Sequence, residues 1–309
     1  MKRQPVLSVE DLSVSFRMYD TGLEQADLQV ISNLTLDVCP GEIVAIAGSS
    51  GSGKSLLAHA VMGLLPGNAS VTGKILYKGM LLSQKEKEKL RGKEIALVPQ
   101  SVSYLDPLMT VGAQVTGRTP DEKTLKAQKE IFQRFHLKEG TEKLYPFQLS
   151  GGMARRILVS TAVLSNAQII LADEPTPGLD LEMAVEALKI FRELADEGKS
   201  VLLITHDIDL AFHIADRVAV FYAGTTVEIA DAEDFQKGPK ALRHPYSKAL
   251  WEALPQNGFK PIPGFQPYAK DLPKGCLFSP RCPYKTEECE KEIPMTKVRG
   301  GYVRCIHAD

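Results

Sequence analysis

"IVAIAGSSGSGKSLLAHAVMGLL", residues 43–65, decides the fold of this 309-residue chain. It begins with a continuously apolar run, as in a strand buried on both faces of a parallel sheet. The segment from Gly48 to Ser55 fits the pattern G-x-x-x-x-G-K-[ST], and apolar residues then recur at helical spacing. A strand, a glycine-rich loop and a helix in this order predict a phosphate-binding loop.

The residue types of this loop suit the phosphates of a nucleotide. Glycines let backbone N–H groups turn inward around phosphate, and the N-terminus of the helix adds its dipole. Lys54 is expected to reach the β- and γ-phosphates, and Ser55 is expected to bind Mg²⁺. The alternative is a strand-to-helix turn that binds nothing, and the predicted strand and helix on either side make it less favoured.

Two further apolar runs, at residues 168–173 and 201–207, predict two more buried strands. The helix expected between them would bury one stripe of residues: Ala184, Leu188, Phe191 and Ala195. Strand, helix and strand together predict an α/β domain. Asp173 ends the first of these strands and is expected to hold Mg²⁺, and Glu174 is expected to orient or deprotonate the attacking water. The simpler interpretation of such acids is a solvated loop.

A second anion-binding loop is predicted at "LSGGM", residues 149–153. Ser150 can cap the helix that follows, and the two glycines leave backbone N–H groups uncovered. A plain helix cap with a flexible turn is the alternative. One nucleotide has no obvious need of both loops, so the residues alone leave the purpose of the second loop open.

The overall composition is that of an ordinary soluble globular protein, with 44% hydrophobic residues, 24% charged residues and a net charge of -1. It is not basic enough to indicate nucleic-acid binding. The first residues lack the apolar run of a secretory signal, and no stretch approaches the length of a membrane span. We therefore expect a cytosolic location, where clustered cysteines more often indicate metal or redox chemistry than disulfides.

Prolines accumulate after Gly238 and periodicity fades, which predicts domains at residues 1–237 and 238–309. The second domain holds four of the five cysteines: Cys276, Cys282, Cys289 and Cys305. Their spacing matches neither the C-x₂-C pairs of common zinc sites nor those of bacterial ferredoxins. A metal centre would hold together a segment with little apolar periodicity, but the spacing does not name the metal. Reduced thiols and a structural zinc both remain open.

The motifs in their order resemble the nucleotide-binding subunit of an ATP-binding cassette (ABC) transporter, over roughly residues 7–230. They are "GSSGSGKS", Gln100 in "LVPQ", "LSGGM", "ILADE", "GLD" and "THD". The resemblance implies an α/β P-loop NTPase cassette with a helical subdomain at about residues 101–165 and a small C-terminal domain that carries the cysteines. In this family two cassettes sandwich two ATP molecules head to tail, so the second loop would serve the partner's nucleotide.

The resemblance also implies roles for individual residues. The catalytic residues would be Glu174, His206, Gln100 and Lys54. Ser55, Gln100 and Asp173 would hold Mg²⁺, and Gln100 would also link to the membrane subunit. His206 would be the switch that holds the γ-phosphate and the catalytic water. The ATP-binding residues would be Phe16, whose ring would stack on adenine unless it is simply core, and Gly48, Ser49, Ser50, Gly51, Ser52, Gly53, Lys54, Ser55, Ser150, Gly151, Gly152 and Asp180.

Two departures from the family pattern stand out. Met153 replaces the commoner glutamine of the signature, as in one branch of peptide importers. "TPGLD", residues 176–180, replaces the usual "TSALD" or "TTALD". Its proline and glycine are expected to alter the stiffness of the loop, and their effect on hydrolysis stays open.

Other segments are similar to the peptide, nickel and opine importer ATPases of bacteria. They are "SVSYLDPLMTVGAQV", "YPFQLSGGM", "RHPYSKAL" and "GCLFSPRC". This resemblance implies a peripheral ATPase on the cytoplasmic face of the inner membrane. Its partners would be a related ATPase in a heterodimer, two permeases and an extracellular substrate-binding protein. Peptide is the first expected cargo, and nickel or a metal-opine complex is the second. Some members carry a [4Fe–4S] cluster on four cysteines, which implies one here.

Two other classes of function are less consistent with the sequence. Soluble cassette ATPases that act on DNA or ribosomes typically carry coiled-coil insertions, tandem cassettes or a basic face, and the sequence has none of these. A redox or metal sensor with vestigial hydrolysis is disfavoured because every hydrolytic position is filled. The segment of residues 121–137 predicts a helix with Leu125, Phe132 and Phe135 on one side. In the resembling family this subdomain receives a permease helix, so we expect contact with the permease near residues 100–114.

Overall fold

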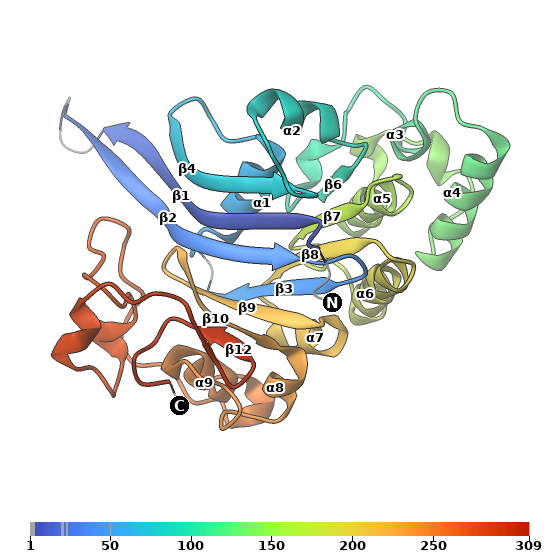
Figure 1. Cartoon of the computed structure of the whole chain (residues 1–309). Helices are drawn as coiled ribbons and strands as arrows, with labels where there is room; N and C mark the ends of the chain where they lie inside the picture. Colours follow the sequence, from blue (N-terminus) through green and yellow to red (C-terminus); the bar gives the residue numbers. More distant parts are fainter. Residues whose placement is uncertain (1–3, 20–21, 23, 50, 309) are drawn as a thin grey trace.

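Two β-sheets frame the computed structural model, which describes residues 4–19, 22, 24–49 and 51–308 (Figure 1). The larger sheet has eight strands in the order β11-β12-β10-β9-β3-β8-β7-β6. Its parallel part consists of β9 (Arg217–Tyr222), β3 (Ile43–Gly48), β8 (Ser200–Thr205), β7 (Ile169–Asp173) and β6 (Ile95–Val98). The carboxyl ends of parallel strands meet at one edge of a sheet, and this edge carries the predicted chemistry.

The three predicted strands are confirmed as β3, β7 and β8, in which every residue is buried. Burial on both faces explains why their sequences are continuous apolar runs. The predicted helix is α6 (Leu181–Asp196), which buries the expected stripe of Ala184, Leu188, Phe191 and Ala195. The α/β fold inferred from these segments is therefore confirmed.

The smaller sheet is antiparallel and was not predicted. It has the order β2-β1-β4-β5, formed by β2 (Gln25–Val38), β1 (Leu7–Tyr19), β4 (Ala69–Tyr77) and β5 (Met80–Leu81). Its inner face packs with α1 (Lys54–Met62) and the larger sheet in one hydrophobic core, which includes Val9, Ile31 and Leu57. Helix α2 (Gln84–Leu90) is short and charged and has no buried residue.

Helices gather beyond the β6 and β7 side of the larger sheet (Figure 1). They are α3 (Val111–Thr116), α4 (Glu122–Arg134) and α5 (Gly151–Val163), with short 3-10 turns at Val102–Tyr104, Thr141–Lys143 and Pro146–Gln148. A second core joins them to α6. Phe132 and Phe135 are buried in it as predicted, but Leu125 is 47% exposed, so the expected stripe is shorter than its sequence indicates.

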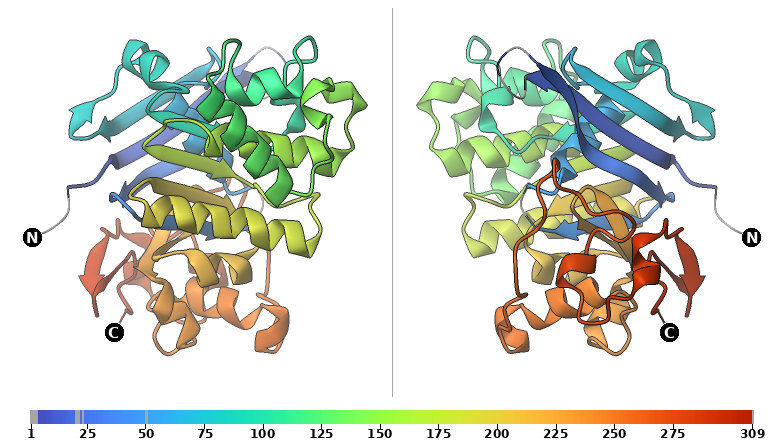
Figure 2. Two further views of the ribbon diagram at one scale, coloured as in Figure 1. Left: turned by 90° about the vertical axis from the view of Figure 1, so that its right-hand side faces the viewer. Right: turned by 90° about the vertical axis from the view of Figure 1, so that its left-hand side faces the viewer.

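The C-terminal region attaches to the free edge of the larger sheet. Helix α7 (Ile208–Ile214) precedes β9, and the region after β9 contains β10 (Thr225–Asp231), α8 (Ala232–Gln236), α9 (Pro245–Glu252), β11 (Thr296–Val298) and β12 (Gly301–Val303), with 3-10 turns at Pro255–Asn257, Ser279–Arg281 and Glu287–Glu290. Strand β12 pairs with β10, so the last strands extend the sheet of the cassette. Figure 2 shows these segments, orange to red, gathered at one end of the molecule in both views. A third core joins Tyr246 and Phe278 to Tyr222 of β9.

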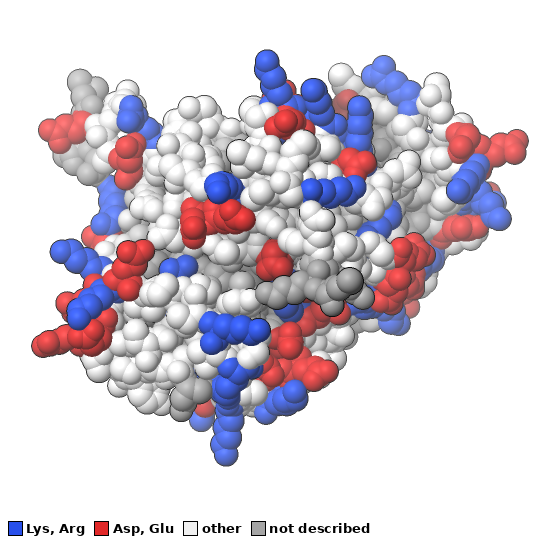
Figure 3. Space-filling model, in the orientation of Figure 1, with Lys and Arg blue, Asp and Glu red and all other residues white. Residues whose placement is uncertain are grey.

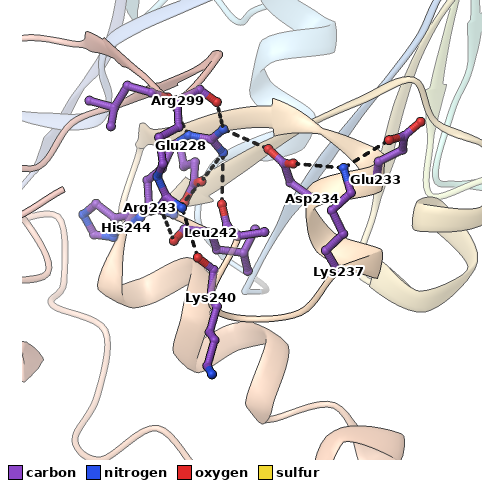
Figure 4. A network of polar contacts seen from close by, with 11 residues as sticks. Glu228, Glu233, Asp234, Lys237, Lys240, Leu242, Arg243, His244 and Arg299 are labelled. Carbon is purple, nitrogen blue, oxygen red and sulfur yellow. Dashed lines mark hydrogen bonds and ion pairs between the residues drawn. The ribbon is translucent and has the colours of Figure 1, made fainter. Parts of the chain in front are cut away.

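A buried ion pair fixes this region to β10 (Figure 4). The side chains of Arg243 and Glu228 are 2% and 0% exposed, with 3.3 Å between Nη1 and Oε1. The backbone N–H groups of Arg243 and His244 also donate to the two Glu228 oxygens, at 2.9 and 2.8 Å. The Arg243 guanidinium also donates hydrogen bonds to Asp234 at 2.8 Å and to the carbonyl oxygen of Val298 at 2.7 Å. Arg243 therefore ties β10, α8 and the C-terminal hairpin together.

The next residue of the "RHPYSKAL" segment caps α9. The Nδ1 atom of His244 accepts a hydrogen bond from the backbone N–H of Tyr246 at 3.0 Å. Burial lowers the pKa of His244 to about 3, so the imidazole is neutral and Nδ1 can act as the acceptor. The segment that resembles the importer ATPases thus has a structural purpose in this chain.

A membrane span requires a helix of sufficient length and apolar character. Among the residues that the structure describes, every helix is too short or too polar to cross a bilayer.

Candidate nucleotide-binding site

The predicted phosphate-binding loop connects β3 to α1, as the sequence indicates. Gly51 and Gly53 have φ angles of 76° and 90°, in the left-handed region that favours glycine. A Cβ atom on Gly48 would lie 2.2 Å from the carbonyl oxygen of Phe221, so only glycine fits there. Helix α1 begins after Gly53 with no side-chain cap, which leaves its first N–H groups for a ligand. Ser50 lies outside the described residues.

Lys54 folds back across this loop. Its ammonium group donates to the carbonyl oxygens of Gly48 at 3.0 Å and Ser49 at 2.9 Å. Burial lowers the pKa of Lys54, and the nearby Glu174 and Asp173 oppose this shift. A buried cation that donates to neutral carbonyls at the loop is well placed to bind an anionic phosphate.

The structure brings together Ser55 and Asp173, the two residues predicted from the motifs to bind Mg²⁺. The Ser55 hydroxyl donates to Asp173 Oδ1 at 2.9 Å. Burial raises the pKa of Asp173, and the Ser55 hydrogen bond opposes this shift. A hard cation prefers hydroxyl and carboxylate oxygens, and its charge would favour the ionised form of this buried acid. These residues therefore fit a magnesium ion.

Glu174 and His206 meet at the same edge of the sheet, although the sequence predicted each one separately. Glu174 Oε2 lies 2.5 Å from His206 Nδ1, and the imidazole side chain is 57% exposed whereas the carboxylate is buried. The Glu174 backbone has a φ of 49°, and its N–H donates to the carbonyl of Ile204 at 2.9 Å. A non-glycine residue held in this region marks local strain of the kind found at functional sites.

Gln100 lies at the end of β6, with its side chain exposed. Its backbone carbonyl accepts from the guanidinium of Arg155 on α5, which also donates to the carbonyl of Pro99 at 2.8 Å. Arg155 is buried, and burial lowers its pKa. Sequence reasoning missed this residue, although a charged residue on the buried face of the helix after "LSGG" was an available signal. Arg155 links the Gln100 loop to the helix of the second anion-binding loop.

The second loop, Ser150 to Gly152, opens α5 as predicted. The Ser150 hydroxyl accepts from the backbone N–H of Met153 at 3.3 Å, and the space beside Gly151 is open. Helix α5 packs in the core of the helical region, whereas α1 packs in the core below the antiparallel sheet. The two anion-binding loops of one chain are therefore built on separate cores.

The "TPGLD" loop contacts this second loop. Asp180 caps α6 by accepting from the N–H of Met183 at 2.9 Å. Gly178 has a φ of 82°, and its carbonyl oxygen lies 3.2 Å from where a Cβ atom on Gly152 would be. A residue other than glycine would be strained at position 178. This left-handed backbone accounts for a glycine where the usual sequence has alanine.

Phe16 is partly buried and packs against the core that holds α1. It lies on β1 between Leu28 of β2 and Ala69 of β4. This packing accounts for an aromatic residue at the position, so its contact with adenine stays a prediction.

The four C-terminal cysteines lie in one region and form no disulfide. The N–H of Cys276 donates to the carbonyl of Cys289 at 2.8 Å. Burial, with smaller contributions from Cys305, Cys282 and Cys289, raises the pKa of the Cys276 thiol to about 11. His307, which sequence reasoning missed, has Nε2 at 3.4 Å from Cys289 Sγ. Nevertheless, no group of three or more His, Cys, Asp or Glu side chains among the described residues is placed to hold a metal ion.

Comparisons with known proteins agree with this geometry. The family described as "ABC transporter" matches residues 31–177, and the family described as "Oligopeptide/dipeptide transporter, C-terminal region" matches residues 227–289. The dipeptide transport ATP-binding protein DppD of Bacillus subtilis is 37% identical, with 96% of this chain and 92% of that protein covered. The oligopeptide transport ATP-binding protein OppD of Escherichia coli is 33% identical, with 97% and 92% covered.

A solved structure also matches. It is the dimeric post-hydrolysis state of the ATP-binding cassette MJ0796 bound to ADP and Pi. Its TM-score is 0.63 at 28% identity, and the match covers 73% of this chain and 98% of that one. The full-length relatives, the two matching families and the assembled phosphate-binding edge lead to one conclusion. This chain belongs to the family of ATP-binding subunits of ABC transporters, in the group that carries the oligopeptide/dipeptide transporter C-terminal region.

Proposed function

We propose that this chain hydrolyses ATP to power a bacterial importer of peptides. One observation carries the proposal of hydrolysis: the Glu174 and His206 contact lies at the sheet edge that also holds the Ser55 and Asp173 pair. The relatives that span nearly the whole chain are named for dipeptide or oligopeptide transport, which supports peptide as the cargo. Nickel or a metal-opine complex is the alternative cargo, and no residue described above favours it.

The site residues divide the work of hydrolysis. Lys54 leaves its carbonyl partners for the β- and γ-phosphates, because an anion is the stronger partner for a buried ammonium group. Ser55, Asp173 and Gln100 hold Mg²⁺, which neutralises phosphate charge when bound. Glu174 orients the attacking water and accepts its proton, and His206 holds the γ-phosphate and that water.

The separation of the two anion-binding loops supports a dimer of cassettes. Ser150, Gly151 and Gly152 contact ATP held by a second, related ATPase subunit, and Asp180 lies in the loop that joins the two sites. Two permeases and an extracellular substrate-binding protein complete the importer, and this chain lies on the cytoplasmic face of the inner membrane. Lys and Arg are interspersed with Asp and Glu on the face shown in Figure 3, where a nucleic-acid-binding ATPase would need a basic surface.

Exposed apolar side chains mark the surface for the permease. Between β6 and α3, Leu108 is 88% exposed, and Val102 and Tyr104 are also exposed. Neighbouring apolar side chains in water favour a protein contact at this surface. They lie within residues 100–114, where contact with the permease is expected.

We expect a crosslinker on Leu108→Cys to capture a permease in the assembled transporter. The control is Leu81→Cys, which is also exposed but lies on β5 of the antiparallel sheet. Mass spectrometry of the crosslinked peptides gives the partner. Crosslinks confined to the C-terminal tail would contradict this docking surface, and co-purification with nucleic acid in place of a permease would contradict the importer.

We also infer that the four cysteines hold a [4Fe–4S] cluster of structural or regulatory use. The support is that one small region gathers four thiols, and that the backbone N–H of Cys276 bonds to the carbonyl of Cys289. In the structure the side chains are not arranged as a ligand set, so the proposal requires them to turn toward a common centre. ATP hydrolysis needs no electron carrier, and no catalytic step is assigned to the cluster.

Protein purified without oxygen is expected to be brown, with broad visible absorbance that Cys282→Ser removes. Iron and sulfide analysis gives the stoichiometry, and Cys39→Ser is the control because Cys39 lies outside the C-terminal region. Colourless protein with stoichiometric zinc would show that the four-cysteine site holds zinc in place of iron. Colourless protein without metal would show that the four cysteines are reduced thiols that bind no metal.

A further inference from the structure

A segment of the C-terminal region contacts the phosphate-binding loop. We call residues 262–266, "IPGFQ", the strap. Its last side chain, Gln266, accepts a hydrogen bond through Oε1 from the Ser49 hydroxyl at 2.5 Å, across 217 positions of sequence. Ser49 is the second residue of the loop, directly after the tightly packed Gly48. The strap therefore holds the loop where it leaves β3.

The strap runs beside the loop. A cavity of about 760 Å³ is lined on one side by Leu28 to Val30 of β2, Gly51 and Ser52, and on the other by residues 265–272. Gln266 thus reaches the loop from one wall of this open space.

Arg281 anchors the strap. Its guanidinium donates to the carbonyl oxygens of Pro263 at 2.7 Å and Ile262 at 3.0 Å, and to the Tyr222 hydroxyl at 3.3 Å. Tyr222 is fully buried at the end of β9, the neighbour of β3 in the sheet. Gly264 turns the strap with a φ of 75°, and the Arg281 side chain packs against it. One rigid part of the sheet therefore supports both the loop and the strap.

Tyr246 packs against the same buried tyrosine that Arg281 contacts. Tyr246 is buried, and its ring lies 4.5 Å from that of Tyr222. Burial raises the pKa of Tyr246, and the nearby Ser49 opposes this shift. Tyr222 therefore supports both Arg281, which holds the strap, and Tyr246.

We propose that Gln266 is a positioning residue for ATP binding, and that Arg281 holds the strap from which it acts. A glycine-rich loop without such support samples many backbone conformations and must lose that entropy when it closes around phosphate. The Ser49 to Gln266 hydrogen bond removes part of this freedom before ATP arrives. The inference rests on the proposed function, because it concerns the same ATP site.

The test compares Gln266→Ala with Gln256→Ala by calorimetric titration with ATP and Mg²⁺. Gln256 is the matched control, since it lies in the same region and bonds to the exposed Asp209 at 2.7 Å, away from the loop. Loss of one neutral hydrogen bond is expected to weaken ATP binding roughly 3- to 10-fold in Gln266→Ala. The Gln256→Ala variant should bind as the unaltered protein does.

Kinetics in the assembled transporter separate positioning from damage to the fold. Gln266→Ala should raise KM for ATP and leave kcat unchanged at saturating ATP, because the catalytic acids keep their places. The double variant Ser49→Ala and Gln266→Ala should bind ATP no more weakly than whichever single variant binds it less tightly. The reason is that each single change already breaks the same hydrogen bond. Unchanged affinity in Gln266→Ala, or strictly additive losses, would overturn the inference.

Amide hydrogen exchange measured without nucleotide tests the effect of the strap on the loop independently of ATP binding. Both Gln266→Ala and Arg281→Lys should speed exchange in residues 48–53, because lysine cannot make the paired bonds of the guanidinium. Gln256→Ala should not. If the unaltered protein bound no ATP, the proposed function would fail, whereas equal exchange in all variants would overturn the role of the strap alone.

Discussion

Glu174→Gln is expected to keep ATP binding and to lose turnover by roughly 100-fold or more, because glutamine cannot accept the proton of the attacking water. The substitution preserves the size of the side chain and leaves Lys54, Ser55 and Asp173 untouched. Calorimetric titration with ATP and Mg²⁺ measures binding, and phosphate release in the assembled transporter measures turnover. Binding and hydrolysis should separate in this one variant.

Two further variants define what that result means. Lys54→Ala should weaken binding and turnover together, because the ammonium group contacts phosphates in every state of the cycle. Glu182→Gln is the matched control, an exposed acid in the first turn of α6 outside the site. Full ATPase activity in Glu174→Gln would show that another group activates the water.

Arg243→Ala is expected to lower the free energy of unfolding by about 3–5 kcal/mol, because it leaves the carboxylate of Glu228 buried without its charged partner. The two side chains are 2% and 0% exposed, so water cannot replace the guanidinium. The carbonyls of Val298 and Arg299 would also lose their donor. Denaturant titration of the purified subunit measures the change.

The control for this ion pair lies in the same network (Figure 4). Lys237 bridges Glu233 and Asp234, and its side chain is exposed. Lys237→Ala should therefore change stability by less than about 1 kcal/mol. A combined Arg243→Met and Glu228→Gln variant should be more stable than Arg243→Ala, because it removes the buried charge. Equal stability of Arg243→Ala and Lys237→Ala would contradict a structural role for the pair.

Local motifs allowed the parallel sheet to be predicted. The strands β3, β7 and β8 are buried on both faces, so each leaves a continuous apolar run, and the glycines of residues 48–53 indicate the turn that follows β3. The antiparallel sheet was missed, because β1 contains a bulge at Asp11 and long exposed segments that blur its alternation. The pairing of β12 with β10 was also missed, since no local pattern signals a partner about 75 residues away.

The sequence predicted most residues of the candidate site but not all of the contacts between them. The strand-end motif predicted the role of Glu174 and the resemblance implied that of His206, but only the register of β7 against β8 brings them into contact. Arg155 and Gln266 act through carbonyl and hydroxyl partners on distant segments, and such pairings have no sequence motif. The cysteines were predicted as a metal site from their number, and their side-chain arrangement does not support this.

The pairing of β12 with β10 has a consequence for synthesis on the ribosome. Translation delivers β10 about 70 residues before β12, so for part of synthesis β10 presents an open edge with unpaired backbone groups. The nascent cassette can assemble its nucleotide-binding edge in that interval, but the sheet is not closed until Gly301 to Val303 emerge. During this interval the exposed edge is where a chaperone would protect the chain and where premature termination would promote aggregation.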